Sequence, residues 1–248
     1  MSCQRFAWPI IAALAACLPL PAVASIGEIF FVEGTVQVTR AGLQSPAATG
    51  FELESGDLIS TGADSQVRMH LKDDSYFALP ANSKFKIDEF SMAQRGRKRK
   101  PSTGIFSLLR GGLRTISGLV GSWTKDTYRV NTPVVTMGIR GTEFSLYYCE
   151  KKSCPDIKNG SYIEVLAGGV KASNKEGAVN LDEGQWGEAH SPPVRVFARP
   201  LVFVRDKSGV FDPSLRIDVH AGIGEVKVDV EADLRIEREP PPSPAQPP

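Results

Sequence analysis

The sequence predicts an all-β protein, either a short β-solenoid or a two-sheet sandwich of short strands, with a β-hairpin added near the C-terminal end. Three observations favour this fold class. Apolar and polar residues alternate along many short segments, the 23 glycines recur about every 8 or 9 residues between Gly27 and Gly224, and no segment of about twelve residues keeps a helical period. With 42% hydrophobic residues among 248, the chain is apolar enough to fold.

Short, half-buried strands are expected directly after residue 26. Their apolar positions are Ile29 and Phe31 before Gly34, Val36 and Val38 after it, then Val67, Met69 and Leu71, then Phe85 and Ile87. Residues 54–57, 61–64 and 72–75 separate strands with glycine, aspartate and serine, which favour turns. The segment closest to a helical pattern, residues 105–120, is interrupted by glycines and is not predicted to be a helix.

A short motif recurs along the chain, in which apolar residues flank a glycine at close spacing. It occurs at Gly34, Gly111, Gly141 and Gly168, and the last three glycines follow one another at intervals of 30 and 27 residues. This spacing suits strands that are wound in successive coils or stacked in a sandwich. A glycine is then expected where each backbone bends or approaches its neighbour.

The C-terminal part, residues 191–239, is predicted to be a β-rich extension. From Glu225 to Glu237 every odd-numbered residue is charged and every even-numbered residue is apolar, while residues 215–221 have the opposite parity. Gly222 and Gly224 lie between the two runs, so a hairpin with one polar and one apolar face is expected. The apolar face must contact the main body or a partner. Residues 240–248 are rich in proline and are predicted to be a disordered tail.

Residues 1–24 have the order of parts found in a secretory signal peptide. Arg5 precedes an apolar run, and the small residues Ala22 and Ala24 suit a cleavage site between Ala24 and Ser25. A periplasmic or secreted protein is therefore expected. Lipid attachment at Cys17, which ends a Leu-Ala-Ala-Cys segment, is an alternative, and an uncleaved anchor is disfavoured because the apolar run is shorter than the ~20 residues that span a bilayer.

Export makes the remaining cysteines, Cys149 and Cys154, a candidate disulfide that would clip a loop at residues 149–160. A zinc site is the first alternative, but the three histidines lie far away in the sequence. A redox role is the second, but four residues separate the two cysteines, and the common redox motif has two.

A run of basic residues is predicted to lie in an exposed loop, residues 92–104. Its charged side chains are Arg95, Arg97, Lys98, Arg99 and Lys100. The run is either a solvated hairpin loop or a small patch for anionic lipid or polysaccharide. Nucleic acid is not expected as a partner, because no aromatic residue lies among these charges to stack on a base.

Motifs for catalysis or cofactor binding are not found. The sequence contains no nucleophile elbow, phosphate-binding loop, zinc-protease motif or dinucleotide fingerprint. Asp73 and Asp74 beside Ser75 suggest a carboxylate pair, but this composition between two alternating runs favours a turn. Four aspartates that could bind calcium lack the spacing of a calcium loop. We therefore expect no enzyme activity, no metal and no cofactor.

Glycines, turns and one compact motif recur in a specific order over residues 27–187. The most specific part is the stretch from Gly138 to Phe144, which follows a Thr-Pro pair. In this order the chain resembles the FecR domain family of bacterial envelope proteins. The resemblance rests on Gly34, Gly56, Asp57, Gly62, Asp73, Asp74, Gly111, Thr132, Pro133, Arg140, Gly141, Thr142, Phe144, Gly168, Gly184 and Gln185.

The resemblance implies an all-β domain of two packed sheets or a short solenoid, here expected at residues 25–190. In the founding members this domain is the periplasmic part of a membrane regulator that relays the occupancy of an outer-membrane iron-siderophore receptor to a cytoplasmic sigma factor. This chain is expected to carry a signal peptide in place of their cytoplasmic anti-sigma segment and membrane helix. Most motif residues are expected to be structural, while Arg140 either pairs with an acid at the core edge or binds a partner.

We therefore expect an exported, non-enzymatic FecR-like binding module for protein recognition or accessory signal transduction in the envelope. An envelope protein is the expected partner. The alternative is a protein that binds polysaccharide or lipid and is thereby held to the cell wall or outer membrane.

Overall fold

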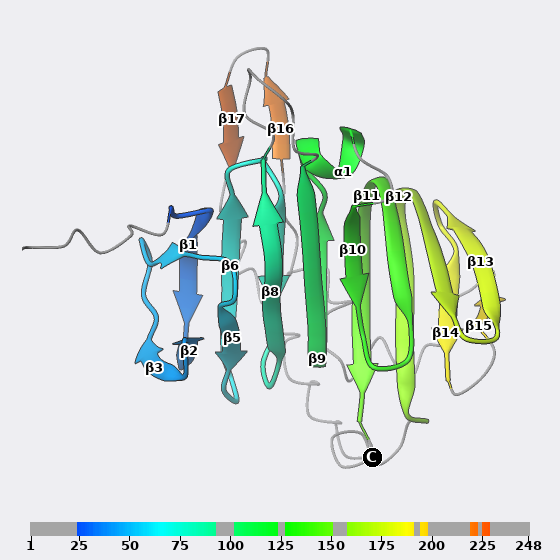
Figure 1. The fold of residues 1–248 in the computed structure, drawn as a ribbon, viewed down its shortest axis with the longest axis horizontal. Coiled ribbons are helices and arrows are strands. Elements are labelled where there is room, and N and C mark those ends of the chain that lie inside the picture. The colour runs from blue at the N-terminus through cyan, green and yellow to red at the C-terminus, as the bar shows by residue number, and fades with distance from the viewer. Residues whose placement is uncertain are drawn as a thin grey trace, which may run out of the picture.

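The structure, a computed structural model, describes residues 24–92, 102–123, 127–150, 158–190, 194–197, 219–222 and 225–228. The main body consists of strands that follow one another in coils, from β1 at one side to β15 at the other (Figure 1). Neighbouring strands pair antiparallel except β9 and β10, which are parallel. Within the described ranges, no helix is long and apolar enough to cross a membrane.

Two layers of strands can be followed through the pairing. The first sheet has the order β3 (Leu43–Pro46), β2 (Val36–Arg40), β5 (Leu58–Thr61), β8 (Lys84–Ser91), the first part of β9 (Thr103–Ile116), β10 (Tyr128–Asn131), the first part of β11 (Thr136–Cys149), the last part of β12 (Gly160–Asn174) and β13 (Gly177–Asp182). The second sheet has the order β4 (Glu52–Leu53), β1 (Gly27–Glu33), β6 (Gln66–Leu71), β7 (Tyr76–Leu79), the remaining parts of β9, β11 and β12, then β14 (Trp186–Ala189) and β15 (Val194–Phe197). The all-β prediction is confirmed.

Long strands turn from one sheet into the other at glycines. β9, β11 and β12 each change pairing partners near Gly111, Gly141 and Gly168, whose φ angles are +79°, +59° and +77°. Gly34, with φ +69°, lies between β1 in the second sheet and β2 in the first. Glycine adopts positive φ without the steric cost that other residues meet. The recurrent glycine motif of the sequence therefore marks the corners of the sandwich.

The hydrophobic core lies between the two sheets. Phe77 of β7 packs across the interface on Phe85 of β8 and Phe106 of β9, with ring centroids 5.2 and 4.8 Å away. Tyr128 of β10 continues this cluster at 5.4 Å from Phe106 and is fully buried. The side chains predicted to be apolar on the inner faces, including Val67, Met69 and Leu71, belong to the same core.

One local prediction differs from the structure. Phe31 does not share the inner face with Ile29, because the register shifts between these two residues, and the Arg68 guanidinium lies 4.9 Å above its ring. Such a bulge moves the following side chains to the other face. Residues 105–120, the segment closest to a helical pattern, are mostly β9 as predicted, and only the last two belong to the short helix α1 (Leu119–Trp123).

Pairing continues beyond the boundary expected at residue 190, because β15 pairs with β14 at the edge of the second sheet. The predicted hairpin is present in the described part of the extension. β16 (Val219–Gly222) pairs with β17 (Glu225–Val228), with Val219 opposite Val228 and Ala221 opposite Val226. The rest of the run to Glu237 lies outside the described residues.

Candidate functional site

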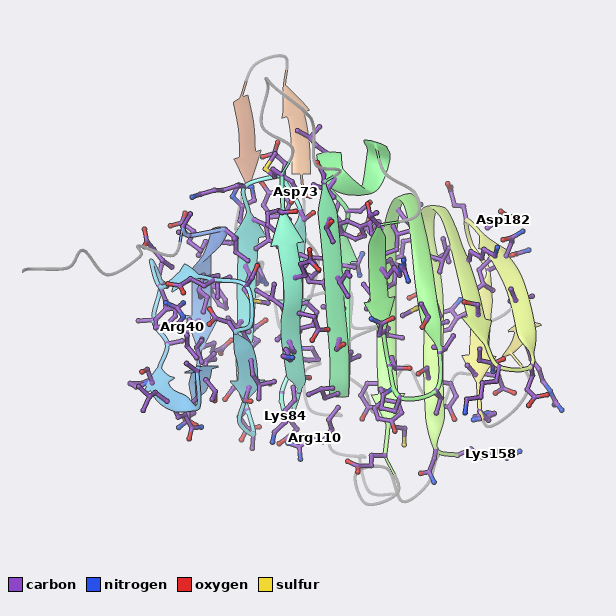
Figure 2. The ribbon with its side chains drawn as sticks, in the orientation of Figure 1. Arg40, Asp73, Lys84, Arg110, Lys158 and Asp182 are labelled. Carbon is purple, nitrogen blue, oxygen red and sulfur yellow. The ribbon has the colours of Figure 1, made fainter. Side chains whose placement is uncertain are left out.

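Asp73 and its neighbours form a buried polar network at one end of the strands, where Figure 2 places Asp73. Both carboxylate oxygens of Asp73 accept hydrogen bonds from Ser75, one from its backbone N at 3.1 Å and one from its hydroxyl at 2.9 Å. The Ser75 hydroxyl also lies 3.2 Å from the Tyr128 hydroxyl and accepts a bond from Gly118 N. α1 is tied to the same turn, since Leu119 N donates to the Asp73 carbonyl.

Burial shifts the pKa values of this network. Desolvation raises the pKa of Asp73, against the lowering effect of its hydrogen bonds from Ser75. Desolvation also raises the pKa of Tyr128, and the nearby Asp73 carboxylate adds to this rise. Because the polar atoms bond one another, this network connects the turn to α1 and β10.

The most specific sequence motif forms the adjoining corner. The backbone N–H of Thr142 donates to the Ser117 hydroxyl at 2.8 Å, and the Thr142 hydroxyl donates to the Gly169 carbonyl at 2.8 Å. Both groups are therefore used within the fold. A Cβ at Gly168 would lie 2.3 Å from the Gly141 carbonyl oxygen. Phe144 is fully buried in the core. The side chain of Arg140 lies outside the described part of the structure, so its partner stays a prediction.

A second polar group surrounds Asp57. Its fully buried carboxylate accepts two bonds from the Arg40 guanidinium, both at 2.8 Å, and one from Glu54 N at 2.8 Å. Arg40 also contacts the Glu54 carboxylate at 2.6 Å, and its pKa is raised chiefly by the hydrogen bond with Asp57. Sequence reasoning missed Arg40, because it comes close to Asp57 only after β2 and β5 have paired.

The remaining motif residues lie in turns. Gly56 and Gly184 have φ of +96° and +75°, and Asp74 adopts +63°. Gly62 N donates to the Thr35 carbonyl, the Thr132 hydroxyl lies 2.7 Å from that of Ser161, and Gln185 accepts a bond from Asp182 N. Pro133 is exposed beside Thr132.

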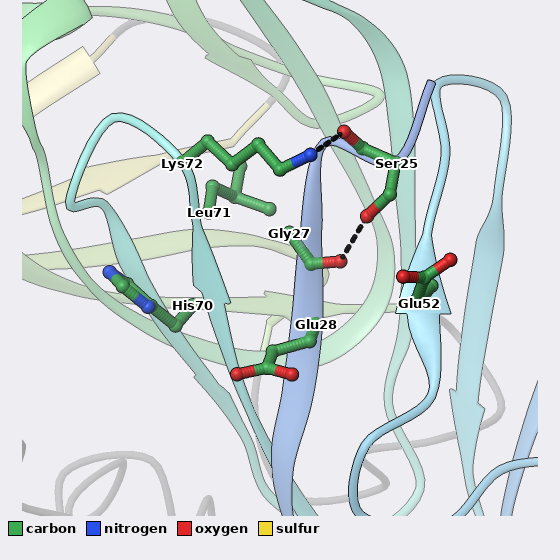
Figure 3. Close-up of a pocket in the computed structure, with 7 residues that line it drawn as sticks. All are labelled: Ser25, Gly27, Glu28, Glu52, His70, Leu71 and Lys72. Carbon is green, nitrogen blue, oxygen red and sulfur yellow. Dashed lines mark hydrogen bonds between the residues drawn. The ribbon is translucent and has the colours of Figure 1, made fainter. Parts of the chain in front are cut away.

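A shallow hollow of about 210 Å³ lies between β1, β4 and β6 (Figure 3). Its lining includes Glu28, Glu52, His70 and Lys72, and the Lys72 ammonium donates to the Ser25 carbonyl. His70 stacks on Tyr76 at 4.5 Å and lies 3.4 Å from the Asp74 carboxylate. No set of three or more metal-ligating side chains that could hold an ion is found among the described residues.

Several predicted features fall wholly or partly outside the described residues. These are the signal peptide with Cys17, the basic residues Arg95 to Lys100, and Cys154. Cys149, at the end of β11, is fully buried and disulfide-bonded. Its pairing with Cys154 stays a prediction.

Comparison with known proteins identifies a family. The family model described as FecR protein matches residues 57–171, which include Asp73, Thr142 and Gly168. Two similar solved structures are crystal structures of a proposed anti-sigma factor from Parabacteroides distasonis ATCC 8503, at 1.65 and 2.50 Å resolution. They have 14% and 13% sequence identity and a TM-score of 0.41, and the similarity covers 56% of this chain and 58% of theirs. No curated protein matches.

This chain thus spans 58% of the length of those solved proteins. The family match confirms the resemblance inferred from the sequence, since residues 57–171 of this chain match the FecR protein model.

Proposed function

We propose that this chain is an exported, non-enzymatic FecR-like module that recognises a protein partner and serves signal transduction in the bacterial envelope. The observation that carries the proposal is the FecR match over residues 57–171. The expected signal peptide supports export to the periplasm. An outer-membrane receptor of the kind that the family resemblance implies, one for iron-siderophore complexes, is the first class of partner to test.

The chemistry of the family motif also supports a recognition role. The hydroxyl of Thr142 and the carboxylates of Asp57 and Asp73 bond to other groups of the fold. They shape corners and turns and do not converge on the hollow beside Lys72. A surface of the sandwich is therefore the better candidate for binding.

The outward face of the first sheet offers such a surface. By strand alternation its side chains include Lys86, Ser107, Asn131, Thr136 and Ser173, which lie opposite one another in one row across five strands. Apart from Lys86, these side chains are small and polar, and such side chains can bond a partner without a large cost in lost rotamer freedom.

A second candidate function is binding to anionic polysaccharide or lipid. The observation that favours it is an excess of basic side chains on the first sheet. Lys84 lies opposite Arg110, both at the same end of the strands in Figure 2, and Arg129 and Lys171 are exposed on neighbouring strands. The basic loop of residues 95–100 would add to this charge.

One experiment separates the two functions. The tagged full chain is expressed in its host, the cells are fractionated, the mature N-terminus is determined by mass, and envelope components bound to the chain are identified. Protein recognition predicts a periplasmic chain that begins at Ser25 and retains one protein partner in about 0.5 M salt and after deletion of residues 95–100. Envelope binding that is lost in salt and on this deletion supports the second candidate, and a cytoplasmic chain with its N-terminal segment intact contradicts both.

A further inference from the structure

The two outward faces of the sandwich differ in burial. In the first sheet, β5 and the first part of β9 alternate between buried and half-buried residues, as expected for strands with one open face. In the second sheet, β7 is buried at all four positions and β9 is buried continuously from Gly111 to Thr115. Since successive side chains point to opposite faces, these parts of the second sheet are covered on both sides.

The covered side chains form a row across five strands. Ala78 of β7 lies opposite Arg114 of β9, which lies opposite Ser145 of β11, and the row continues through Glu164 of β12 to Trp186 of β14. We call these five residues the covered row. Ala78 and Ser145 are 0% exposed and Trp186 is 7% exposed.

The covered row faces away from the core between the sheets. Phe77, Phe144 and Leu146, which flank Ala78 and Ser145 in sequence, belong to the core cluster, whereas Ala78, Ser145 and Trp186 do not. The described elements that contact β7 most are its sheet neighbours β6 and β9, and those that contact β14 are β12 and β15. Long side chains of neighbouring strands, such as Arg68 and Arg114 opposite Ala78, can cover the small residues of this face. The larger side chains of Tyr162 and Trp186 are also less than a tenth exposed, and this points to a covering segment from outside the sheet.

We propose that the outward face of the second sheet is an intramolecular docking surface for residues 198–211, the segment of this chain that follows β15. β15 ends at Phe197, directly opposite Trp186 at the end of the covered row. The chain therefore leaves the sheet beside the surface that is buried. The segment is also apolar, with Leu-Val-Phe-Val at positions 201–204 and Val-Phe at positions 210–211.

Length and chemistry both allow this contact. An extended segment from 198 to 211 reaches about 46 Å, while crossing from β14 to β7 requires about 19 Å, four spacings between neighbouring strands. The surface offers aromatic area from Tyr162 and Trp186, each less than a tenth exposed. Arg114 forms an ion pair with Glu143 at 2.6 Å, so the positive charge of Arg114 beside this aromatic area is balanced. Burial of the segment's Phe and Val side chains on this area stabilises the contact through the hydrophobic effect.

The two outward faces of the sandwich thereby have different roles, which the proposed function alone does not require. The second sheet is occupied by the chain itself, and the outward face of the first sheet is left for an external partner.

Thiol labelling tests the covered row in the full chain. Ser145→Cys is introduced as a reporter, with Cys3 and Cys17 replaced by serine, and the exposed Ala178→Cys on β13 serves as the matched reporter. Cys149 is disulfide-bonded and does not react. We expect the Ser145→Cys thiol to react at least about 30-fold more slowly with maleimide than the Ala178→Cys thiol, because labelling needs a local opening.

Charge placed in the segment is expected to release the surface. F203D combined with V204D puts a carboxylate on both sides of an extended chain and should speed the labelling of the Ser145→Cys thiol by about 10-fold or more. K207D combined with S208D, at polar positions of the same segment, should leave the labelling rate unchanged. Equal labelling of the two reporters in the parent chain, or an unchanged rate with F203D and V204D in a folded protein, overturns the proposal.

A second measurement does not depend on a destabilised variant. A photoreactive amino acid replaces Glu164, which is half-buried within the covered row, and the crosslinked peptides are mapped. A crosslink within one chain to residues 198–211 is the expected result. A crosslink to residues 225–237, or to a second copy of the chain, contradicts the assignment.

Discussion

Gly168 shows at the residue scale why a corner of this sandwich needs glycine. Its φ is +77°, and a Cβ there would lie 2.3 Å from the Gly141 carbonyl oxygen, a backbone atom that cannot move aside easily. Gly184 has nearly the same φ, +75°, but nothing lies within 4 Å of its Cβ position. Substitution of each glycine by alanine therefore separates the free-energy cost of the positive φ from the free-energy cost of the close contact.

Gly168→Ala is expected to lower the free energy of unfolding by more than about 3 kcal/mol, and Gly184→Ala by about 1 kcal/mol, the cost of positive φ alone. Urea unfolding of both variants measures the difference. Equal losses would show that the contact with Gly141 does not restrict the corner.

Asp73 predicts a dependence of stability on pH. Burial raises its pKa in the folded protein above the ordinary value of 3.8, so the folded state binds this proton more tightly than the unfolded state does. The contribution of Asp73 to stability is therefore complete below pH 3.8 and decreases as the pH rises toward the folded pKa.

Asp73→Asn removes this titration. Relative to the parent, the variant should gain stability as the pH rises above the ordinary pKa of 3.8, on top of a constant loss from the altered hydrogen bond to Val120 N. Urea unfolding at several pH values provides the measurement, with the exposed Asp182→Asn as the control. A difference between parent and variant that does not change with pH would contradict the raised pKa.

At the scale of the elements, the corner of β11 is joined to that of β12 by one buried hydrogen bond. The Thr142 hydroxyl donates to the Gly169 carbonyl, and Thr142 is 3% exposed. Thr142→Val keeps the shape but leaves this carbonyl without its partner, so a loss of about 1 to 2 kcal/mol is expected. Thr136→Val, on the half-buried outward side of the same strand, should cost less in the same urea unfolding experiment.

The loop between β11 and β12 carries a further prediction. If Cys149 pairs with Cys154, the disulfide closes a short loop and restricts the unfolded chain, so Cys154→Ser should lower the free energy of unfolding by about 2 kcal/mol. Thermal unfolding measures this loss, and mass spectrometry without reductant shows whether the parent lacks two hydrogens. Unchanged stability together with free thiols in the parent would overturn the pairing.

Alternation predicted the strands β1, β2, β6 and β8 and the hairpin of β16 and β17, and glycine spacing predicted the corners. Met69 and Ile87 lie in the core as expected, and the glycines of the recurrent motif lie at the corners. A β-bulge cannot be recognised from the alternation of apolar and polar residues, so the outward orientation of Phe31 could not be predicted. The pairing of Arg40 with Asp57 joins residues 17 positions apart on different strands, and no local spacing indicates it.

The double burial of the second sheet did leave a signal. Residues 76–79 are Tyr-Phe-Ala-Leu, a continuous apolar run, and such runs are typical of strands that are covered on both faces. The run was too short to be separated from the surrounding alternation by sequence alone.

At the scale of the whole molecule, the outward face of the first sheet is open, and that of the second sheet is buried over β7 and part of β9. The open face carries the row from Lys86 to Ser173, and the covered face carries the row from Ala78 to Trp186. The hollow beside Lys72 lies apart from both rows, near the start of β1. We therefore propose the first sheet as the surface that recognises an envelope protein.

Photocrosslinking in living cells tests this assignment most directly. A photoreactive amino acid is placed in turn at Ser60, Lys86 and Lys171 on the open face, and at Glu164 on the covered face. The account predicts that positions on the open face crosslink to the same envelope protein and that position 164 crosslinks within the chain. Crosslinks to one envelope protein from position 164, with none from the three positions on the first sheet, would contradict it.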